Sequence, residues 1–133
     1  MADQREQQPE TDERFPSGPW IGFYQQGGLQ SRQRLGLEFK NGKITGEGRD
    51  PAGHFLVSGV YDADACRCSL TKTYTTHTVE YDGNAEGDGI WGRWVIRFSV
   101  FVVDRGVFHI WPDSSAGAEA DSAKTEQPEP AAV

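Results

Sequence analysis

Residues 34–50 read RLGLEFKNGKITGEGRD and indicate the fold class. Residues 34–40 alternate apolar and polar side chains, a pattern typical of a half-buried β-strand. Asn41-Gly42 follows, and this dipeptide is the strongest short-range signal for a β-hairpin because both residues tolerate a positive φ. Residues 43–50 alternate again and predict the returning strand. The stretch therefore predicts two antiparallel strands joined by a tight turn.

Similar segments recur on both sides of this hairpin. β-branched and aromatic residues are frequent between residues 20 and 112, and no window there shows helical apolar spacing for more than one turn. We expect strands at 20–25, 34–40, 43–50, 54–62, 66–75, 76–81, 89–103 (a long strand or one with a break) and 107–111. Among the turns, we expect one at 82–88, DGNAEGD, and one at 104–106, DRG.

The short connections predict the arrangement of these strands. A turn of a few residues joins antiparallel neighbours, whereas parallel neighbours need a long crossover. Closing eight up-and-down strands into a barrel removes both sheet edges. We therefore expect an all-β, mainly antiparallel up-and-down barrel of about eight strands, with a two-sheet sandwich as the alternative.

Charge divides the 133-residue chain into three parts. Residues 1–19 have a net charge of −3 and residues 113–133 a net charge of −4, which together equal the −7 of the whole chain. The stretch between them is neutral and contains all four Trp and all four Tyr. We expect a disordered acidic tail at 1–17, a single barrel domain at 18–112 and a second disordered acidic tail at 113–133.

The composition also excludes several classes of protein. An acidic chain without a basic surface argues against binding to nucleic acid or to an anionic membrane. No run approaches the roughly 20 apolar residues of a transmembrane helix. The first fourteen residues lack the apolar core of a signal peptide, and two cysteines are too few for a disulfide scaffold. We expect a cytoplasmic protein with free thiols that binds neither nucleic acid nor membrane.

Several short segments resemble the calycin class of barrels, which includes avidin and streptavidin, lipocalins and fatty-acid-binding proteins. Gly18-Pro19-Trp20 resembles the G-x-W that opens their first strand. Residues 43–48, KITGEG, and 57–62, VSGVYD, are similar to the second to fourth strands of avidins. Residues 92–96, GRWVI, resemble the late strand in which avidins place a tryptophan. The resemblance implies the barrel architecture and a ligand in the barrel mouth.

The chain also departs from each of these families. No C-terminal helix or disulfide of the lipocalin kind is visible, and only about ten residues separate the first two expected strands, where fatty-acid-binding proteins carry a helix pair. The biotin-binding polar residues of avidins do not map onto this chain. Biotin is therefore not implied, and we expect no cofactor.

Two cysteines lie two residues apart on the expected strand 66–75. Cys66 and Cys68 on one face form either half of a metal site, a redox pair or simply two small strand residues. A metal site needs about four ligands, and His77 is a lone further candidate. We expect no metal.

Lys72 has the same phase in that strand as Leu70 and Tyr74. If this face points inward, an ammonium group lies inside the barrel and must be paired or solvated, because an isolated buried charge is very costly. Asp50, Glu80 and Asp82 are the candidate partners. If the face points outward, Ser69, Thr71 and Thr73 lie inside instead.

The remaining polar motifs do not indicate an enzyme. Asp82, Glu86 and Asp88 lie in one expected loop, but the order of an EF-hand is absent, so the segment is either an acidic cation loop or a turn. No nucleophile elbow, P-loop, dinucleotide fingerprint or zinc-protease motif occurs. The sequence favours a non-enzymatic role with no catalytic residue.

Aromatic residues in phase along the strands form a candidate wall for a ligand. Trp91 and Trp94 fall on opposite faces, and we expect Trp94 inside with Ile90, Gly92 and Ile96. The candidate ligand-binding residues are Tyr24, Tyr61, Tyr74, His77, Tyr81 and Trp94. His77 is either a ligand contact or base, or a half-buried histidine bonded to a carbonyl.

Three functions are compatible with such a barrel. The first is a non-enzymatic module that holds a small, partly apolar molecule in the barrel. The second is a protein-interaction or oligomerisation module with a filled barrel and no ligand. The third is an isomerase or cyclase that uses the barrel as a shaped vessel. Cavity volume separates the first two, because a ligand site should measure roughly 300 Å³ or more.

Overall fold

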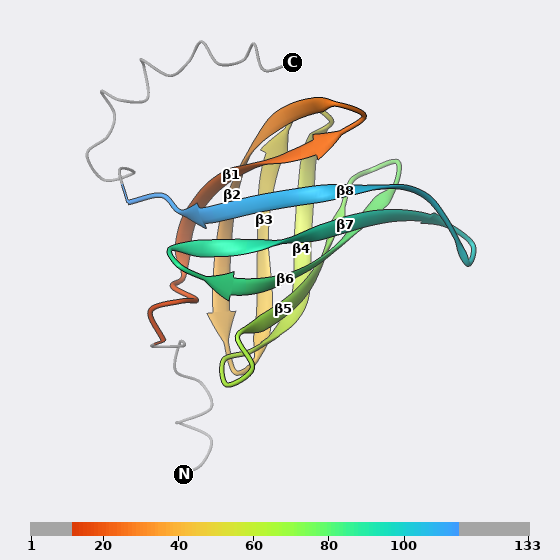
Figure 1. Ribbon diagram of the computed structural model, residues 1–133. Coiled ribbons are helices and arrows are strands. Elements are labelled where there is room, and N and C mark those ends of the chain that lie inside the picture. The colour runs from red at the N-terminus through yellow and green to blue at the C-terminus, as the bar shows by residue number, and fades with distance from the viewer. Residues whose placement is uncertain (1–11, 115–133) are drawn as a thin grey trace.

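The computed structural model describes residues 12–114, and these form a closed, all-β barrel (Figure 1). The eight strands follow one another around the barrel in chain order, and each is antiparallel to both neighbours. They are β1 (Gly18–Gln26), β2 (Leu29–Lys40), β3 (Lys43–Asp50), β4 (Gly53–Asp62), β5 (Arg67–Thr73), β6 (Thr78–Glu86), β7 (Gly89–Phe98) and β8 (Phe101–Pro112). The predicted fold class is confirmed, and the barrel agrees with the architecture that the resemblance to calycins implies. Most of both predicted tails lies outside the described residues.

The hairpin predicted for residues 34–50 joins β2 to β3. Asn41 and Gly42 have φ angles of 56° and 76°, as a tight turn with two left-handed residues requires. Lys40 pairs with Lys43, and the register continues to Arg34 opposite Arg49. The predicted return strand, residues 43–50, matches β3 at both ends.

Two predicted turns are wrong. Residues 82–86 continue β6, and the chain turns at Gly87, while residues 104–106 lie inside β8. The long strand expected at 89–103 breaks at Ser99, whose φ is 61°. The glycines inside these two segments allow close packing of the backbone and do not form turns. A Cβ on Gly106, for example, would lie 2.2 Å from the Gln25 carbonyl oxygen.

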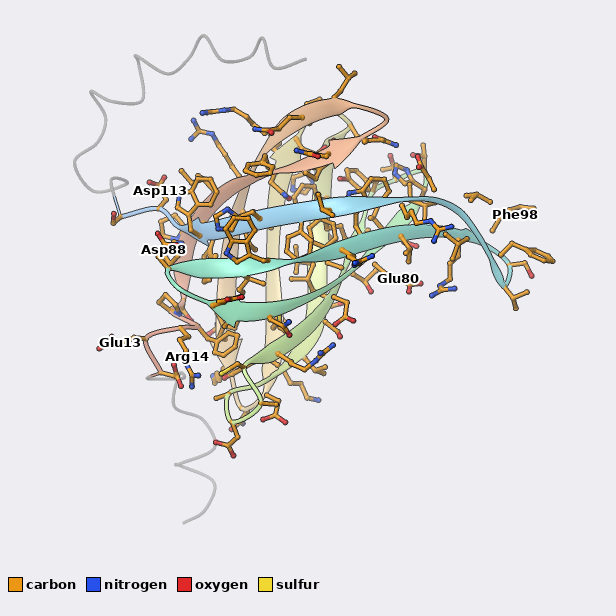
Figure 2. The ribbon with its side chains drawn as sticks, in the orientation of Figure 1. Glu13, Arg14, Glu80, Asp88, Phe98 and Asp113 are labelled. Atoms are coloured by element: carbon orange, nitrogen blue, oxygen red, sulfur yellow. The ribbon has the colours of Figure 1, made fainter. Side chains whose placement is uncertain are left out.

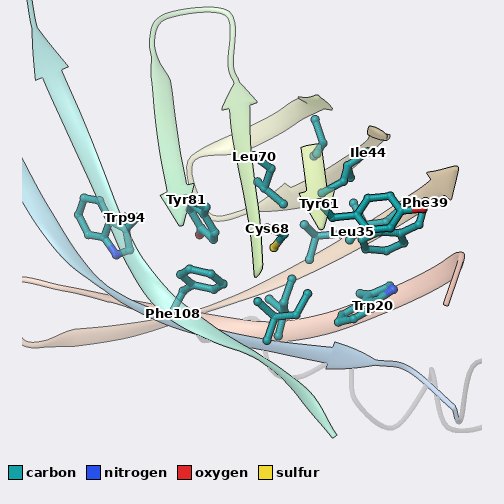
Figure 3. Packing of buried hydrophobic residues seen from close by; sticks show 14 of the residues in the cluster. Trp20, Leu35, Phe39, Ile44, Tyr61, Cys68, Leu70, Tyr81, Trp94 and Phe108 are labelled. Atoms are coloured by element: carbon teal, nitrogen blue, oxygen red, sulfur yellow. The ribbon is translucent and has the colours of Figure 1, made fainter. Parts of the chain in front are cut away.

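One end of the barrel is closed by aromatic side chains. Phe15 is fully buried, and its ring centroid lies 5.4 Å from that of Phe39 and 5.0 Å from that of Tyr61. Trp20 packs on Phe39 at 5.7 Å and donates a hydrogen bond to the Pro16 carbonyl (Figure 3). Phe15 falls within the tail predicted for 1–17, so at least this residue belongs to the barrel core.

The two neighbouring tryptophans of β7 allow a test of the register. Trp94 is 2% exposed and Trp91 is 48% exposed, as the alternation predicts. The Trp91 ring also stacks on the ring of His109. Trp94→Ala should lower the free energy of unfolding by about 3–5 kcal/mol because it empties part of the core. Trp91→Ala should cost about 1 kcal/mol or less. Urea unfolding of both variants measures this, and equal losses would contradict the assignment.

Candidate functional site

Lys72 points into the barrel from β5. The inward residues of this strand are Cys68, Leu70 and Lys72, and the Lys72 side chain is 1% exposed. Alternation alone left its direction open, and the structure selects the inward face. Its outward neighbours in β5, Thr71 and Thr73, are more exposed.

The buried ammonium group of Lys72 has three hydrogen-bond acceptors. Its Nζ donates to Asp50 Oδ2 at 2.9 Å, to the Tyr81 hydroxyl at 3.0 Å and to Gln33 Oε1 at 3.1 Å. The Asp50 side chain is 0% exposed, so both charges of the ion pair are buried. An ammonium group has three protons, and this network uses all of them.

Aromatic rings complete the surroundings of Lys72. Its Nζ lies 4.3 Å from the ring centroid of Phe55, 4.8 Å from that of Tyr81, 5.0 Å from that of Tyr24 and 5.6 Å from that of Tyr74. Each ring face attracts a cation, and the attraction is stronger where water is excluded. These contacts offset part of the cost of removing the charge from water.

Burial shifts the pKa values of this cluster. It lowers the pKa of Lys72 to about 8, although Asp50 opposes the shift. Burial also raises the pKa of Tyr81 and of Tyr74, and Tyr74 further donates a hydrogen bond to Asp50. Near neutral pH the cluster therefore holds two neutral phenols beside the ion pair of Lys72 and Asp50. The pKa of Lys72 lies only about one unit above this pH.

A small cavity borders the Lys72 cluster at the end of the barrel opposite Phe15. We call this end the mouth, and it carries the β1–β2, β3–β4 and β5–β6 connections. The cavity measures about 50 Å³, enough for about three or four water molecules and far less than a typical ligand pocket. Its lining residues are Tyr24, Gln26, Ala52, Lys72, Tyr74, His77, Val79, Tyr81, Trp94 and Ile96.

Five of the six candidate ligand-binding residues line this cavity: Tyr24, Tyr74, His77, Tyr81 and Trp94. Tyr61 is the exception, because it faces inward at the closed end against Phe15. His77 lies in the loop before β6 rather than in a strand, and its ring stacks on Tyr74 at 4.5 Å.

Sequence reasoning missed Gln33 and Phe55 as members of the Lys72 cluster. Gln33 shares the phase of Leu35 in β2, so extending that alternation by one step would have found it. Its Oε1 accepts from Lys72 and Tyr81, while its buried Nε2 has no hydrogen-bond partner within residues 12–114. Asp50 was a candidate partner of Lys72, and this pairing is confirmed.

The outer polar groups assemble differently from the sequence expectation. Asp82 lies in β6 and forms an ion pair with Arg67 at 3.0 Å, so it does not share a loop with Asp88. Cys66 and Cys68 are free, and no group of three metal-ligand side chains gathers in the described part of the chain. Residues 12–114 also contain no helix that could span a membrane.

A second surface with unusual properties is the projecting end of β7 and β8. β7 pairs with β6 only as far as Val95, and β8 pairs with β1 only from Phe108 onward. Residues 96–104 therefore form a two-stranded ribbon that extends beyond the barrel wall (Figure 1). We call it the β7–β8 ribbon, and Phe98 stands at its far end in Figure 2.

The tip of this ribbon is apolar and exposed. Phe98 is 74% exposed, Val100 76%, Phe101 68% and Val103 60%. The charged residues lie nearer the barrel, where Arg97 bonds Glu80 and Asp104 accepts a hydrogen bond from Gln26. Residues 98–103 contain no charged side chain.

Comparison of the chain with protein-family models, curated proteins and solved structures found no match. Function is therefore inferred from the geometry of the mouth cavity and of the β7–β8 ribbon.

The buried Lys72 predicts how stability depends on pH. Its pKa is about 8 in the folded protein and 10.5 in the unfolded chain, so between these values the unfolded chain binds more protons. Stability should therefore rise by about 1–2 kcal/mol from neutral pH to about pH 9.5. Urea unfolding measures this dependence and is done in a Cys68→Ala background. Burial raises the pKa of Cys68 to about 12, so above pH 9 ionisation of this thiol in the unfolded chain would lower the stability.

The matched control is Cys68→Ala combined with Lys72→Arg. Arginine keeps a charge beside Asp50 but does not titrate in this range. The free energy of unfolding of this double variant should stay level over the same pH series. The series stops below pH 10, the pKa of tyrosine in the unfolded chain, so that tyrosine ionisation contributes little. A level or falling curve with Lys72 present would contradict the prediction.

Proposed function

We propose that this chain is a non-enzymatic interaction module whose β7–β8 ribbon pairs with the ribbon of a second copy. The observation that carries this proposal is a charge-free, exposed ribbon tip with two open backbone edges. A strand edge carries unpaired N–H and C=O groups that can pair with another strand. The small cavity supports this function over a ligand-filled barrel, because about 50 Å³ at the mouth is far less than a typical ligand pocket.

The open edges favour a protein strand over a lipid bilayer as the partner. Backbone groups inserted into hydrocarbon would lose their hydrogen bonds to water without replacement. A net charge of −7 also opposes approach to an anionic lipid surface. A second copy supplies an edge of the same kind, and a twofold interface uses the same patch on both molecules.

The residues along β8 tolerate such pairing. With the twofold axis at Val103, Phe101 faces Arg105 of the partner subunit, and Val102 faces Asp104 of the partner subunit. No like charges stand opposite each other in this register. The backbone hydrogen bonds of the ribbon edge are then completed by the same segment of the other molecule.

Sedimentation equilibrium over a concentration series tests this proposal on the full chain. We expect a reversible shift from the 14.7 kDa monomer toward the dimer, strengthened by salt because salt screens the repulsion between two acidic molecules. Val103→Lys should abolish the shift. Val60→Lys is the matched control, since Val60 is 56% exposed on β4, whose two edges are both paired.

Each of three outcomes would overturn the proposal. One is a monomer at every concentration and salt level. The second is a protein that associates with phosphatidylserine vesicles, in a Val103-dependent manner, while remaining monomeric without them. The third is loss of the dimer in both lysine variants, which would assign the contact to a different face.

A second function, the holding of a small molecule at the mouth, is favoured by the five candidate residues that line the cavity. The polar groups at this site are largely satisfied: Lys72 has three acceptors, Tyr74 donates to Asp50, and Trp94 Nε1 donates to the Gln25 carbonyl at 3.1 Å. The cavity wall therefore combines aromatic and aliphatic side chains with polar groups that largely have partners already. The ligand that fits is a partly apolar molecule of a few heavy atoms.

Acetone is a suitable probe for this second function. In a titration followed by NMR of the indole N–H groups, we expect a saturable shift of Trp94, which borders the cavity. Trp91 lies on the outer face and serves as the control within the same molecule, so its resonance should not move. Parallel, non-saturating drifts of both resonances would indicate a solvent effect and contradict a site at the mouth.

A further inference from the structure

We infer that Lys72 is a covalent attachment site for small aldehydes that enter through the mouth. The inference rests on the second function proposed above, binding at the mouth, and is independent of ribbon pairing. Three observations carry it: Lys72 borders the cavity, the cavity has room for a few heavy atoms, and an acid–base partner lies beside the amine.

The position of Lys72 distinguishes it from the other lysines. The chain has four, at positions 40, 43, 72 and 124. Lys43 is exposed and Lys40 partly exposed, whereas Lys72 is 1% exposed among aromatic rings. A compound that reaches Lys72 must therefore fit the cavity of about 50 Å³, which selects for size.

The chemistry balances without a further reactant. The ammonium group passes one proton to Asp50, and the resulting amine attacks the aldehyde carbon, so that a C–N bond forms and the carbonyl π electrons move to oxygen. The oxygen then takes the proton from Asp50 and a second proton from nitrogen. The C–O bond breaks, water leaves, and the nitrogen lone pair forms the C=N bond. Ammonium and aldehyde thus give a protonated imine and water.

The surroundings suit both ends of this reaction. Asp50 lies 2.9 Å from Nζ, close enough to take a proton and return it. Burial brings the pKa of Lys72 to about 8, so a large share of the group is nucleophilic amine in mildly alkaline solution. The product keeps one positive charge, which stays paired with Asp50 and in contact with the same rings.

The same contacts argue against a small anion as the ligand. All three ammonium protons have acceptors, and Asp50 neutralises the charge of Lys72. A phosphate or sulfate would have to break this pair and bring a second negative charge next to Asp50. An uncharged carbonyl compound meets neither obstacle.

Reductive trapping tests the inference on the full chain. The protein is incubated at about pH 8 with acetaldehyde and limiting cyanoborohydride, and peptide mass spectrometry then locates the added ethyl groups. We expect Lys72 to be labelled at least about tenfold faster than Lys43, because the cavity brings the aldehyde to Lys72 and burial lowers the pKa of Lys72 to about 8. Lys40 and Lys43 are controls within the same molecule. Benzaldehyde, which exceeds the cavity, should label the exposed lysines and spare Lys72.

Lys72→Arg is the variant control, since arginine keeps the charge beside Asp50 but forms no such imine under these conditions. It should lose only the fast phase of labelling. Labelling of Lys72 no faster than that of Lys43, or equal labelling by benzaldehyde, would overturn the inference. A saturable acetone shift of Trp94 without labelling of Lys72 would overturn covalent attachment alone. Absence of both signals would overturn binding at the mouth as well.

Discussion

The ion pair between Lys72 and Asp50 is the interaction on which the rest of the interior depends. Two charges buried from water cost several kcal/mol each unless their geometry and hydrogen bonds compensate. Compensation here requires Gln33, Tyr81 and Tyr74 at hydrogen-bond distance, and therefore β2, β3, β5 and β6 in one register. A slip of one residue in any of these strands would turn a member of the network to the outside.

This network divides the barrel into two ends with different properties. On one side Phe15, Trp20, Phe39 and Tyr61 fill the space with rings in contact. At the mouth, the polar groups of the network are packed less densely, and the small cavity lies beside them. Within the described residues, each of the eight strands contributes buried apolar side chains to this interior.

The two candidate functional surfaces meet at the base of the β7–β8 ribbon. Ile96 lines the cavity and is also the first residue of the ribbon, beyond the last β6 pairing. Gln26 lines the cavity as well, and its side chain donates to Asp104 of the ribbon. The mouth and the ribbon therefore share structural supports, although the contacts proposed for them use different atoms.

Local sequence patterns were enough to predict the strands, their antiparallel order and most of the residues that face inward. Asn41-Gly42 and the alternation around it are local signals, and the same period placed Trp94 inside and Trp91 outside. Alternation with a period of two does not indicate which of the two faces is the inner one. The direction of the Lys72 side chain therefore could not be predicted from it. Turn positions were also misjudged, because a glycine that makes room for a close backbone neighbour looks the same in sequence as a glycine that turns the chain.

The position of each inward residue along the barrel axis depends on the tertiary structure. Tyr61 and Tyr74 both face inward, yet one packs against Phe15 and the other lines the mouth. Asp50 pairs with Lys72, whereas Asp82 pairs with Arg67 on the outer face. Height and pairing depend on the register of strands distant in sequence. That register is set by closure of the whole barrel and by the need to satisfy one buried charge with another.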